Sequence, residues 1–152
     1  MAELFQEIVS HCAVETGLTS LDMPGVVMRL LAAMAQHGDF DAARIETVAA
    51  EVLQREALSS TVLPQGVAIP HTHTDAVTRL HAAIGVSAES GLELGAPDGP
   101  TRLVVLVLSP IDASTQHLQF MAGLSRRLLR DDLAQHFAGT KTANHVRKLL
   151  LG

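Results

Sequence analysis

The stretch Leu103-Val-Val-Leu-Val-Leu108 consists only of branched aliphatic residues. Such a run, six residues long and without polar alternation, is typical of a strand that is buried on both faces of a sheet. Residues 80–87 carry an aliphatic or alanine side chain at every second position, which predicts a half-buried strand. A shorter apolar run, 67–69, ends at Pro70, which has no N–H to donate to a neighbouring strand. The centre of the chain therefore predicts a sheet.

Helical patterns lie on both sides of these strands in the sequence. The best periodicity is that of Ile45, Val48, Ala49, Val52 and Leu53, in a helix expected from 39–41 to about 57. We also expect a short helix over 2–10, an extended piece over 13–16, a helix between the cap Asp22 and Gly38, a loop over 59–66, and helices over about 112–130, 132–138 and 142–151. This order favours an α/β fold, a three-layer sandwich whose mixed sheet is flanked by helices on both faces, as one domain over 1–152.

Composition narrows the classes of function. The 152 residues are 47% hydrophobic, but no apolar run approaches the roughly 20 residues of a membrane span, so no direct membrane insertion is expected. A net charge of −5 and the absence of Trp and Tyr argue against nucleic acid as a partner. An acidic N-terminus instead of a basic one, and a single Cys12, predict a cytoplasmic protein in a reducing compartment.

The densest reactive cluster is Gly66-Val-Ala-Ile-Pro-His71-Thr-His73-Thr-Asp75. His71 follows the short strand and a proline that fixes the backbone before it, so we expect its side chain at a sheet edge. Neutral imidazole is a good nucleophile near pH 7 when a neighbour orients its other nitrogen. The segment also matches the His-x-His-x-Asp core of metallo-β-lactamase-like hydrolases, with His71, His73 and Asp75 as zinc ligands. Because Ala76 follows and the chain is short for that scaffold, a zinc hydrolase stands only as an alternative, and we expect no metal and no cofactor.

Two residues distant in sequence are candidates to join His71. Arg55 ends the predicted helix beside the loop that leads to His71, where a guanidinium can hold a tetrahedral anion; an ordinary surface arginine is the equal alternative. His117 precedes Phe120, Met121 and Leu124 at helical spacing and so points inward. A hydrogen-bonded core histidine is the commoner outcome at such a position.

These residues resemble a known family. Arg55-Glu-Ala-Leu-Ser-Ser-Thr61, followed after five residues by Val67-Ala-Ile-Pro-His71, is similar to the signature of the fructose/mannitol-type (type 2) enzyme IIA domain of the bacterial phosphoenolpyruvate-dependent sugar phosphotransferase system, which includes nitrogen-regulatory IIA proteins. Ala96-Pro-Asp-Gly-Pro100, Ser109-Pro110 and His117-Leu118 fall where the family has similar segments. The resemblance covers nearly the whole chain from about residue 10.

The resemblance implies a phosphoryl carrier. His71 takes the role of the phosphorylated histidine, Arg55 that of the arginine beside the phosphate, and His117 that of the second active-site histidine. The implied donor is the phosphocarrier protein HPr or a protein like it, and the acceptor is a IIB component. A regulatory, nitrogen-type IIA that binds target proteins according to its phosphorylation state is the alternative. Thr72 departs from the small residue usual after the phosphorylated histidine; it crowds the docking face, and its hydroxyl is a candidate phosphate ligand.

Overall fold

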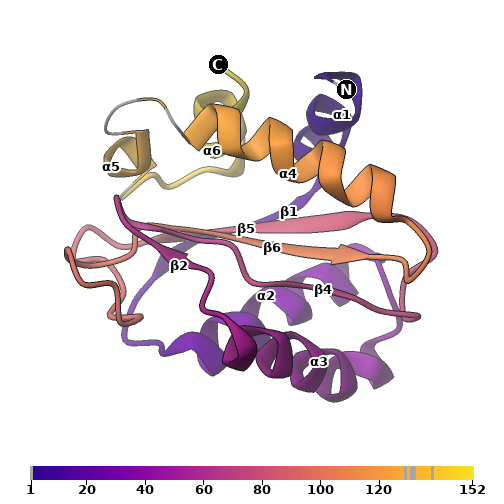
Figure 1. Cartoon of the computed structure of the whole chain (residues 1–152). Coiled ribbons are helices and arrows are strands. Elements are labelled where there is room, and N and C mark those ends of the chain that lie inside the picture. Colours follow the sequence, from indigo (N-terminus) through magenta and orange to yellow (C-terminus); the bar gives the residue numbers. More distant parts are fainter. Residues whose placement is uncertain (1, 129, 131–132, 138) are drawn as a thin grey trace.

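The computed structural model describes residues 2–128, 130, 133–137 and 139–152 (Figure 1). The helices are α1 (Ala2–His11), α2 (Met23–His37), the 3-10 turn η1 (Ala42–Arg44), α3 (Ile45–Leu58), α4 (Ser114–Leu128), α5 (Leu133–Phe137) and α6 (Ala143–Leu151). The strands are β1 (Ala13–Leu18), β2 (Val62–Leu63), β3 (Val67–Ala68), β4 (His71–His73), β5 (His81–Ser87) and β6 (Leu103–Ser109).

The sheet is mixed and has the order β1-β5-β6-β3-β2, with β4 also pairing with β6. β6 runs antiparallel to β5 and parallel to β3 and β4, while β1 is parallel to β5. All seven residues of β6 are buried, as its aliphatic run predicts. Figure 1 shows α2 and α3 below the sheet and α1, α4, α5 and α6 above it. The predicted three-layer α/β sandwich is therefore confirmed.

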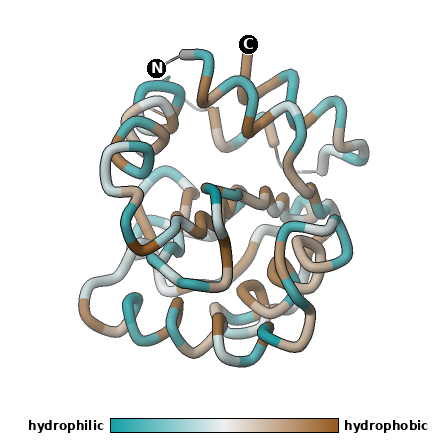
Figure 2. The backbone as a smooth tube through the Cα atoms, turned by 90° about the vertical axis from the view of Figure 1, so that its right-hand side faces the viewer, coloured by the Kyte–Doolittle hydropathy of each residue, from teal (hydrophilic) through white to brown (hydrophobic). Residues whose placement is uncertain are grey.

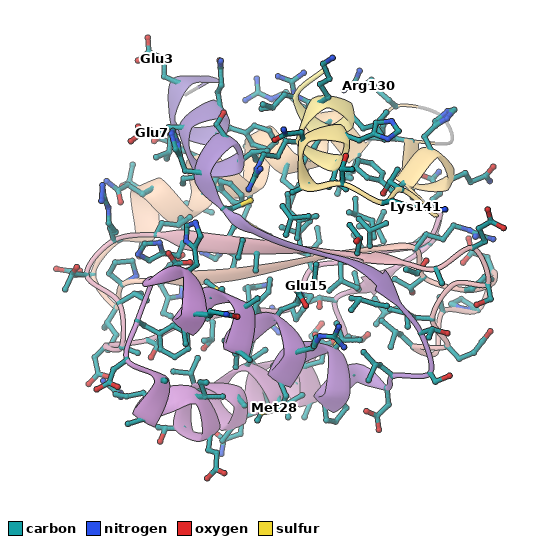
Figure 3. The ribbon with its side chains drawn as sticks, turned by 180° about the vertical axis from the view of Figure 1, so that it is seen from behind. Glu3, Glu7, Glu15, Met28, Arg130 and Lys141 are labelled. Atoms are coloured by element: carbon teal, nitrogen blue, oxygen red, sulfur yellow. The ribbon has the colours of Figure 1, made fainter. Side chains whose placement is uncertain are left out.

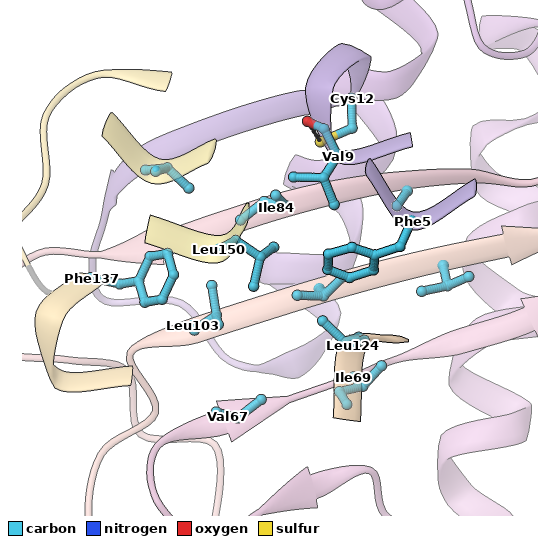
Figure 4. Close-up of a cluster of buried hydrophobic side chains, with 14 of the residues drawn as sticks. Phe5, Val9, Cys12, Val67, Ile69, Ile84, Leu103, Leu124, Phe137 and Leu150 are labelled. Atoms are coloured by element: carbon cyan, nitrogen blue, oxygen red, sulfur yellow. Dashed lines mark hydrogen bonds between the residues drawn. The ribbon is translucent and has the colours of Figure 1, made fainter. Parts of the chain in front are cut away.

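Two apolar layers separate the helices from the sheet, and β6 supplies both. Leu103, Val105 and Val107 belong to the layer under α1, α4, α5 and α6, where Figure 4 shows Phe5, Leu124 and Phe137. The intervening residues of β6 pack on α2 and α3. Figure 2 shows the helices alternating between hydrophilic and hydrophobic residues, and Figure 3 places Glu3 and Glu7 on the outside of α1.

Several boundaries differ from those predicted. Pro70 interrupts the strand expected over 67–69 but does not end it, because the chain resumes as β4 along the same neighbour, and the Pro70 carbonyl accepts from Val107 N at 3.0 Å. The expected loop 59–66 contains β2, and the helix expected from 39–41 begins only at Ile45, after a 3-10 turn capped by Asp41. Two other predicted helices, one reaching about residue 130 and one over 132–138, lie partly outside the described residues.

One edge of the sheet collects the ends of three elements. β4 and β6 are parallel, and His73 pairs with Ser109 at their carboxyl ends. The chain leaves β6 through a short loop and enters α4 at Ser114, so that the first turn of α4 stands over this edge. Of the described helices, none is long and apolar enough to span a membrane.

Candidate functional site

Three imidazoles meet at this edge. Because alternate residues of a strand share a face, β4 presents His71 and His73 on the same side of the sheet. His117, in the first turn of α4, lies against both: its ring centroid is 5.4 Å from that of His71 and 4.6 Å from that of His73. The structure therefore brings together His71 and His117, which were expected to share a site, and places His73, considered from the sequence only as a zinc ligand, beside His117.

His71 is held by the backbone just before it. Its Nδ1 lies 2.7 Å from the carbonyl oxygen of Ile69. A carbonyl oxygen only accepts hydrogen bonds, so Nδ1 carries the proton. In the neutral ring the lone pair is then on Nε2, and the half-buried side chain is oriented for use of that nitrogen.

His117 is held by a different partner and is kept neutral. Its Nδ1 lies 2.7 Å from the hydroxyl of Ser109, which is fully buried. Burial lowers the pKa of His117 to about 4, with further lowering by the charges of His73, His71 and Arg55. The hydroxyl has no other hydrogen-bond partner among the described residues, so its buried O–H is satisfied only by donating to Nδ1, which leaves the imidazole proton on Nε2. His117 is thus a hydrogen-bond donor, not a base, near pH 7.

Arg55 occupies the last turn of α3, as the sequence predicts. Its Nη1 donates to the carbonyl of Ser59 at 3.2 Å, which ties the guanidinium to the loop after the helix. It pairs with no carboxylate among the described residues. Its charge helps to lower the pKa of His117, so a permanent cation lies within electrostatic reach of that imidazole. The site therefore offers a nucleophilic nitrogen, a neutral donor and a fixed positive charge.

Comparison with known proteins decides the family. Residues 15–152 match the family model described as "Phosphoenolpyruvate-dependent sugar phosphotransferase system, EIIA 2". The chain belongs to this family. The IIA domain is 33% identical over 100 residues to the fructose-specific EIIA component of Haloferax volcanii, covering 65% of this chain and 64% of that protein. It is 32% identical to the nitrogen regulatory protein of Bradyrhizobium diazoefficiens, over 65% of each chain. The alignments thus span just under two thirds of these two relatives.

Solved structures agree on the fold. The crystal structure of the nitrogen regulatory protein IIA-Ntr from Neisseria meningitidis superposes with a TM-score of 0.79 at 25% identity, covering 97% of this chain and 99% of that one. The mannitol IIA of Escherichia coli superposes with a TM-score of 0.72 at 20% identity, covering 90% of this chain and 94% of that one. The resemblance stated from the motifs is confirmed.

Thr72 and Asp75 take positions that the sequence did not predict. Thr72 is nearly buried and lies on the face of β4 opposite the two histidines, and its hydroxyl donates to the carbonyl of His73 at 3.3 Å. It is not brought together with the imidazoles of the IIA domain. Asp75 binds Arg44 at 2.6 Å, and this contact, through its hydrogen bond and its charge, lowers the pKa of the carboxyl.

The zinc-hydrolase alternative is not supported. Among the described residues, no group of three His, Cys, Asp or Glu side chains is placed to hold a metal ion. Asp75 is engaged by Arg44 instead. The family match also points to a phosphotransferase-system domain and not to a hydrolase.

Ser109 and the Ile69 carbonyl hold the rings of His117 and His71, and neither contact was predicted from the sequence. The serine ends the buried strand directly beneath the start of α4, and a polar residue closing an aliphatic run is the signal that could have found it. A backbone carbonyl leaves no such signal in a single sequence.

Proposed function

We propose that this IIA domain is a phosphoryl carrier that accepts a phosphoryl group on Nε2 of His71 and passes it on. The observation that carries the proposal is the contact of His71 Nδ1 with the Ile69 carbonyl. It leaves Nε2 as the free nucleophile on a ring whose orientation is fixed. Phosphoryl transfer requires mainly that the protein position the nucleophile and stabilise the charge on the equatorial oxygens of the phosphoryl group.

The transfer balances without a base. The N–P bond of a donor phosphohistidine breaks as Nε2 of His71 bonds to phosphorus, and the donor ring keeps the electron pair. His71 retains its Nδ1 proton, so its ring becomes positively charged while the phosphoryl group carries the negative charge. The Ile69 carbonyl accepts from this N–H before and after transfer and stabilises the ring charge. Onward transfer is the same step in reverse, toward a new acceptor.

Arg55 and His117 have separate roles in this proposal. The Arg55 guanidinium stabilises the phosphoryl oxygens by charge and by paired donors, and the neutral His117 donates from Nε2. The low pKa of His117 supports this role, because a neutral ring does not compete with His71 for a proton. Thr72, expected as a phosphate ligand from the sequence, has no role in this arrangement, since its hydroxyl is turned to the opposite face.

We take the donor to be an HPr-like phosphocarrier protein and the acceptor to be a IIB component, in the cytoplasm. The family match supports this, as does the fold shared with the E. coli mannitol IIA that was solved in complex with phosphorylated IIB. A regulatory role, in which a target protein replaces IIB, is the second candidate. It is favoured by the match to IIA-Ntr of Neisseria meningitidis over nearly the full length of both chains.

Incubation with phosphoenolpyruvate, enzyme I and HPr tests the proposal. We expect one acid-labile phosphate, a ³¹P shift typical of the Nε2 isomer, and no label in His71→Ala. His145→Gln, which removes an exposed histidine from α6, is the matched control and should label normally. An unlabelled wild type, or a labelled His71→Ala, contradicts the proposal. Capture of a IIB component by the phosphorylated form favours transport, and phosphorylation-dependent capture of another protein favours regulation.

A further inference from the structure

The carbonyl that fixes the proton of His71 belongs to a peptide group that is itself weakly held. The acceptor is the Ile69 carbonyl, 2.7 Å from Nδ1. Because Pro70 follows, this peptide group has no N–H with which a neighbouring strand could hold it. Its orientation depends on the hydrogen bonds on either side. On one side the Pro70 carbonyl accepts from Val107 N at 3.0 Å. On the other side Ile69 N donates to the carbonyl of Thr61 at 3.1 Å.

The two sides differ in how firmly they are held. Val107 lies in β6, the fully buried central strand. Thr61 instead follows the exposed residues Ser59 and Ser60, in the link between α3 and β2. Glu56, in the last turn of α3, holds Thr61 in place: its Oε2 accepts from Thr61 N at 2.7 Å, and its Oε1 accepts from the Thr61 hydroxyl. Both oxygens of this carboxylate therefore bind one residue.

Glu56 occupies a position that does not favour a carboxylate. The last turn of a helix carries the negative end of the helix dipole, where cations are preferred. The half-buried Glu56 offsets this cost with its two hydrogen bonds to Thr61. Arg55, the residue before it, donates from Nη1 to the Ser59 carbonyl at 3.2 Å. The last turn of α3 thus binds the link at two points, and it carries the proposed phosphate ligand next to the residue that binds Thr61.

We propose that Glu56 is a positioning residue for His71, which acts through Thr61 and Ile69 to keep the imidazole proton on Nδ1. The inference rests on the proposed function. With the Ile69 carbonyl facing Nδ1, the lone pair on Nε2 is free to bond to phosphorus. If that carbonyl turns away, the neutral ring can carry its proton on Nε2 instead, and this nitrogen must lose the proton before it can accept a phosphoryl group.

Two substitutions separate positioning from charge. Glu56→Ala removes both acceptors. Glu56→Gln removes the charge but keeps both contacts, because its amide oxygen accepts from Thr61 N and its NH₂ group donates to the Thr61 hydroxyl. The matched control is Glu51→Ala, on the same helix: Glu51 accepts from the buried Thr74 hydroxyl at 2.9 Å, beyond the other end of β4. Glu51→Ala removes an equivalent carboxylate–threonine contact that does not lead to Ile69.

The tautomer of His71 is read from its ring nitrogens by ¹⁵N–¹H NMR at pH 8.5, where an ordinary histidine is neutral. We expect the proton on Nδ1 in wild type, Glu56→Gln and Glu51→Ala, and a mixture of both tautomers in Glu56→Ala. If Glu56→Ala does not fold, Thr61→Val decides, because it removes only the hydroxyl contact and should shift the tautomer in the same direction. An unchanged tautomer, or an equal mixture in Glu51→Ala, refutes the inference.

Transfer rates complete the test. Each protein is phosphorylated by phospho-HPr and by phosphoramidate, a small N–P donor that needs no protein docking. Glu56→Ala should be slowed about tenfold with both donors, and Glu56→Gln and Glu51→Ala should stay within about twofold of wild type. Slowing with phospho-HPr alone would assign Glu56 to docking, and faster transfer in both Glu56 variants would show an effect of charge; either result refutes positioning.

The same rates distinguish this inference from the proposed function. If wild type is labelled on Nε2 of His71 and Glu56→Ala is labelled as fast, only the positioning role is wrong. If neither donor labels His71 in wild type, the proposed function is overturned, and the role of Glu56 in transfer is overturned with it.

Discussion

Replacing His117 with Gln tests whether the buried imidazole is neutral. In the folded protein burial lowers the pKa of His117 to about 4, against 6.5 for an ordinary histidine. Below pH 6.5 the unfolded chain therefore binds a proton that the folded chain does not. As the pH is lowered from 6.5 towards 4, the free energy of unfolding decreases, and the decrease stops where the folded state also binds the proton. At pH 4.5 a shift of this size costs about 2 kcal/mol, after allowing for solvent relaxation around the ring.

Urea unfolding at pH 7 and pH 4.5 measures this cost. Wild type should lose about 2 kcal/mol more between the two pH values than His117→Gln does. The amide of Gln can still bind the Ser109 hydroxyl, and any constant difference between the proteins drops out of the comparison. His145→Gln sets the change that follows from the loss of an exposed histidine. Parallel losses in wild type and His117→Gln would refute a neutral, buried His117, and with it the donor role argued above.

Substitutions at three further positions test separate parts of the structure. Arg55→Gln should slow phosphoryl transfer from HPr by about 10–100-fold and Arg55→Lys by less, because a charge-assisted hydrogen bond contributes about 1.5–3 kcal/mol. If Arg55→Gln transfers as fast as wild type, the guanidinium has no role in transfer. Gly85→Ala should lower the free energy of unfolding in urea by about 1–3 kcal/mol, since its Cβ would lie 2.9 Å from Cδ1 of the buried Leu18. Ser109→Ala should slow transfer while leaving the labelled nitrogen unchanged in ³¹P spectra, because it frees the tautomer of His117 alone.

The sequence predicts the centre of this fold better than its edges. In the run 103–108 the side chains on both faces of a strand are aliphatic, so both faces must be buried, and the run becomes the central strand β6. The resumption of pairing after Pro70 was missed because proline removes a donor but keeps its carbonyl, and that carbonyl accepts from Val107. The sequence around Pro70 shows that a backbone N–H is missing. That the Pro70 carbonyl still pairs with β6 is visible only in the structure.

The strand β4 also decides where Thr72 lies. Its hydroxyl was a candidate phosphate ligand because Thr72 directly follows His71. With β4 in place, alternation alone turns it to the face opposite His71. The approach of His73 to His117 was not predictable in this way, because it depends on how α4 is set over the sheet edge, 44 residues further along the chain.

The two central imidazoles show how one residue type serves two purposes. The Ile69 carbonyl can only accept, so it fixes the proton of His71 on Nδ1 and exposes a bare Nε2. The buried Ser109 hydroxyl needs an acceptor, so it fixes the proton of His117 on Nε2 and makes that nitrogen a donor. The rings are 5.4 Å apart, yet their partners assign them opposite roles, nucleophile and hydrogen-bond donor. Neither assignment requires a charge on either ring, and His117 stays a neutral donor at every pH well above its pKa of about 4.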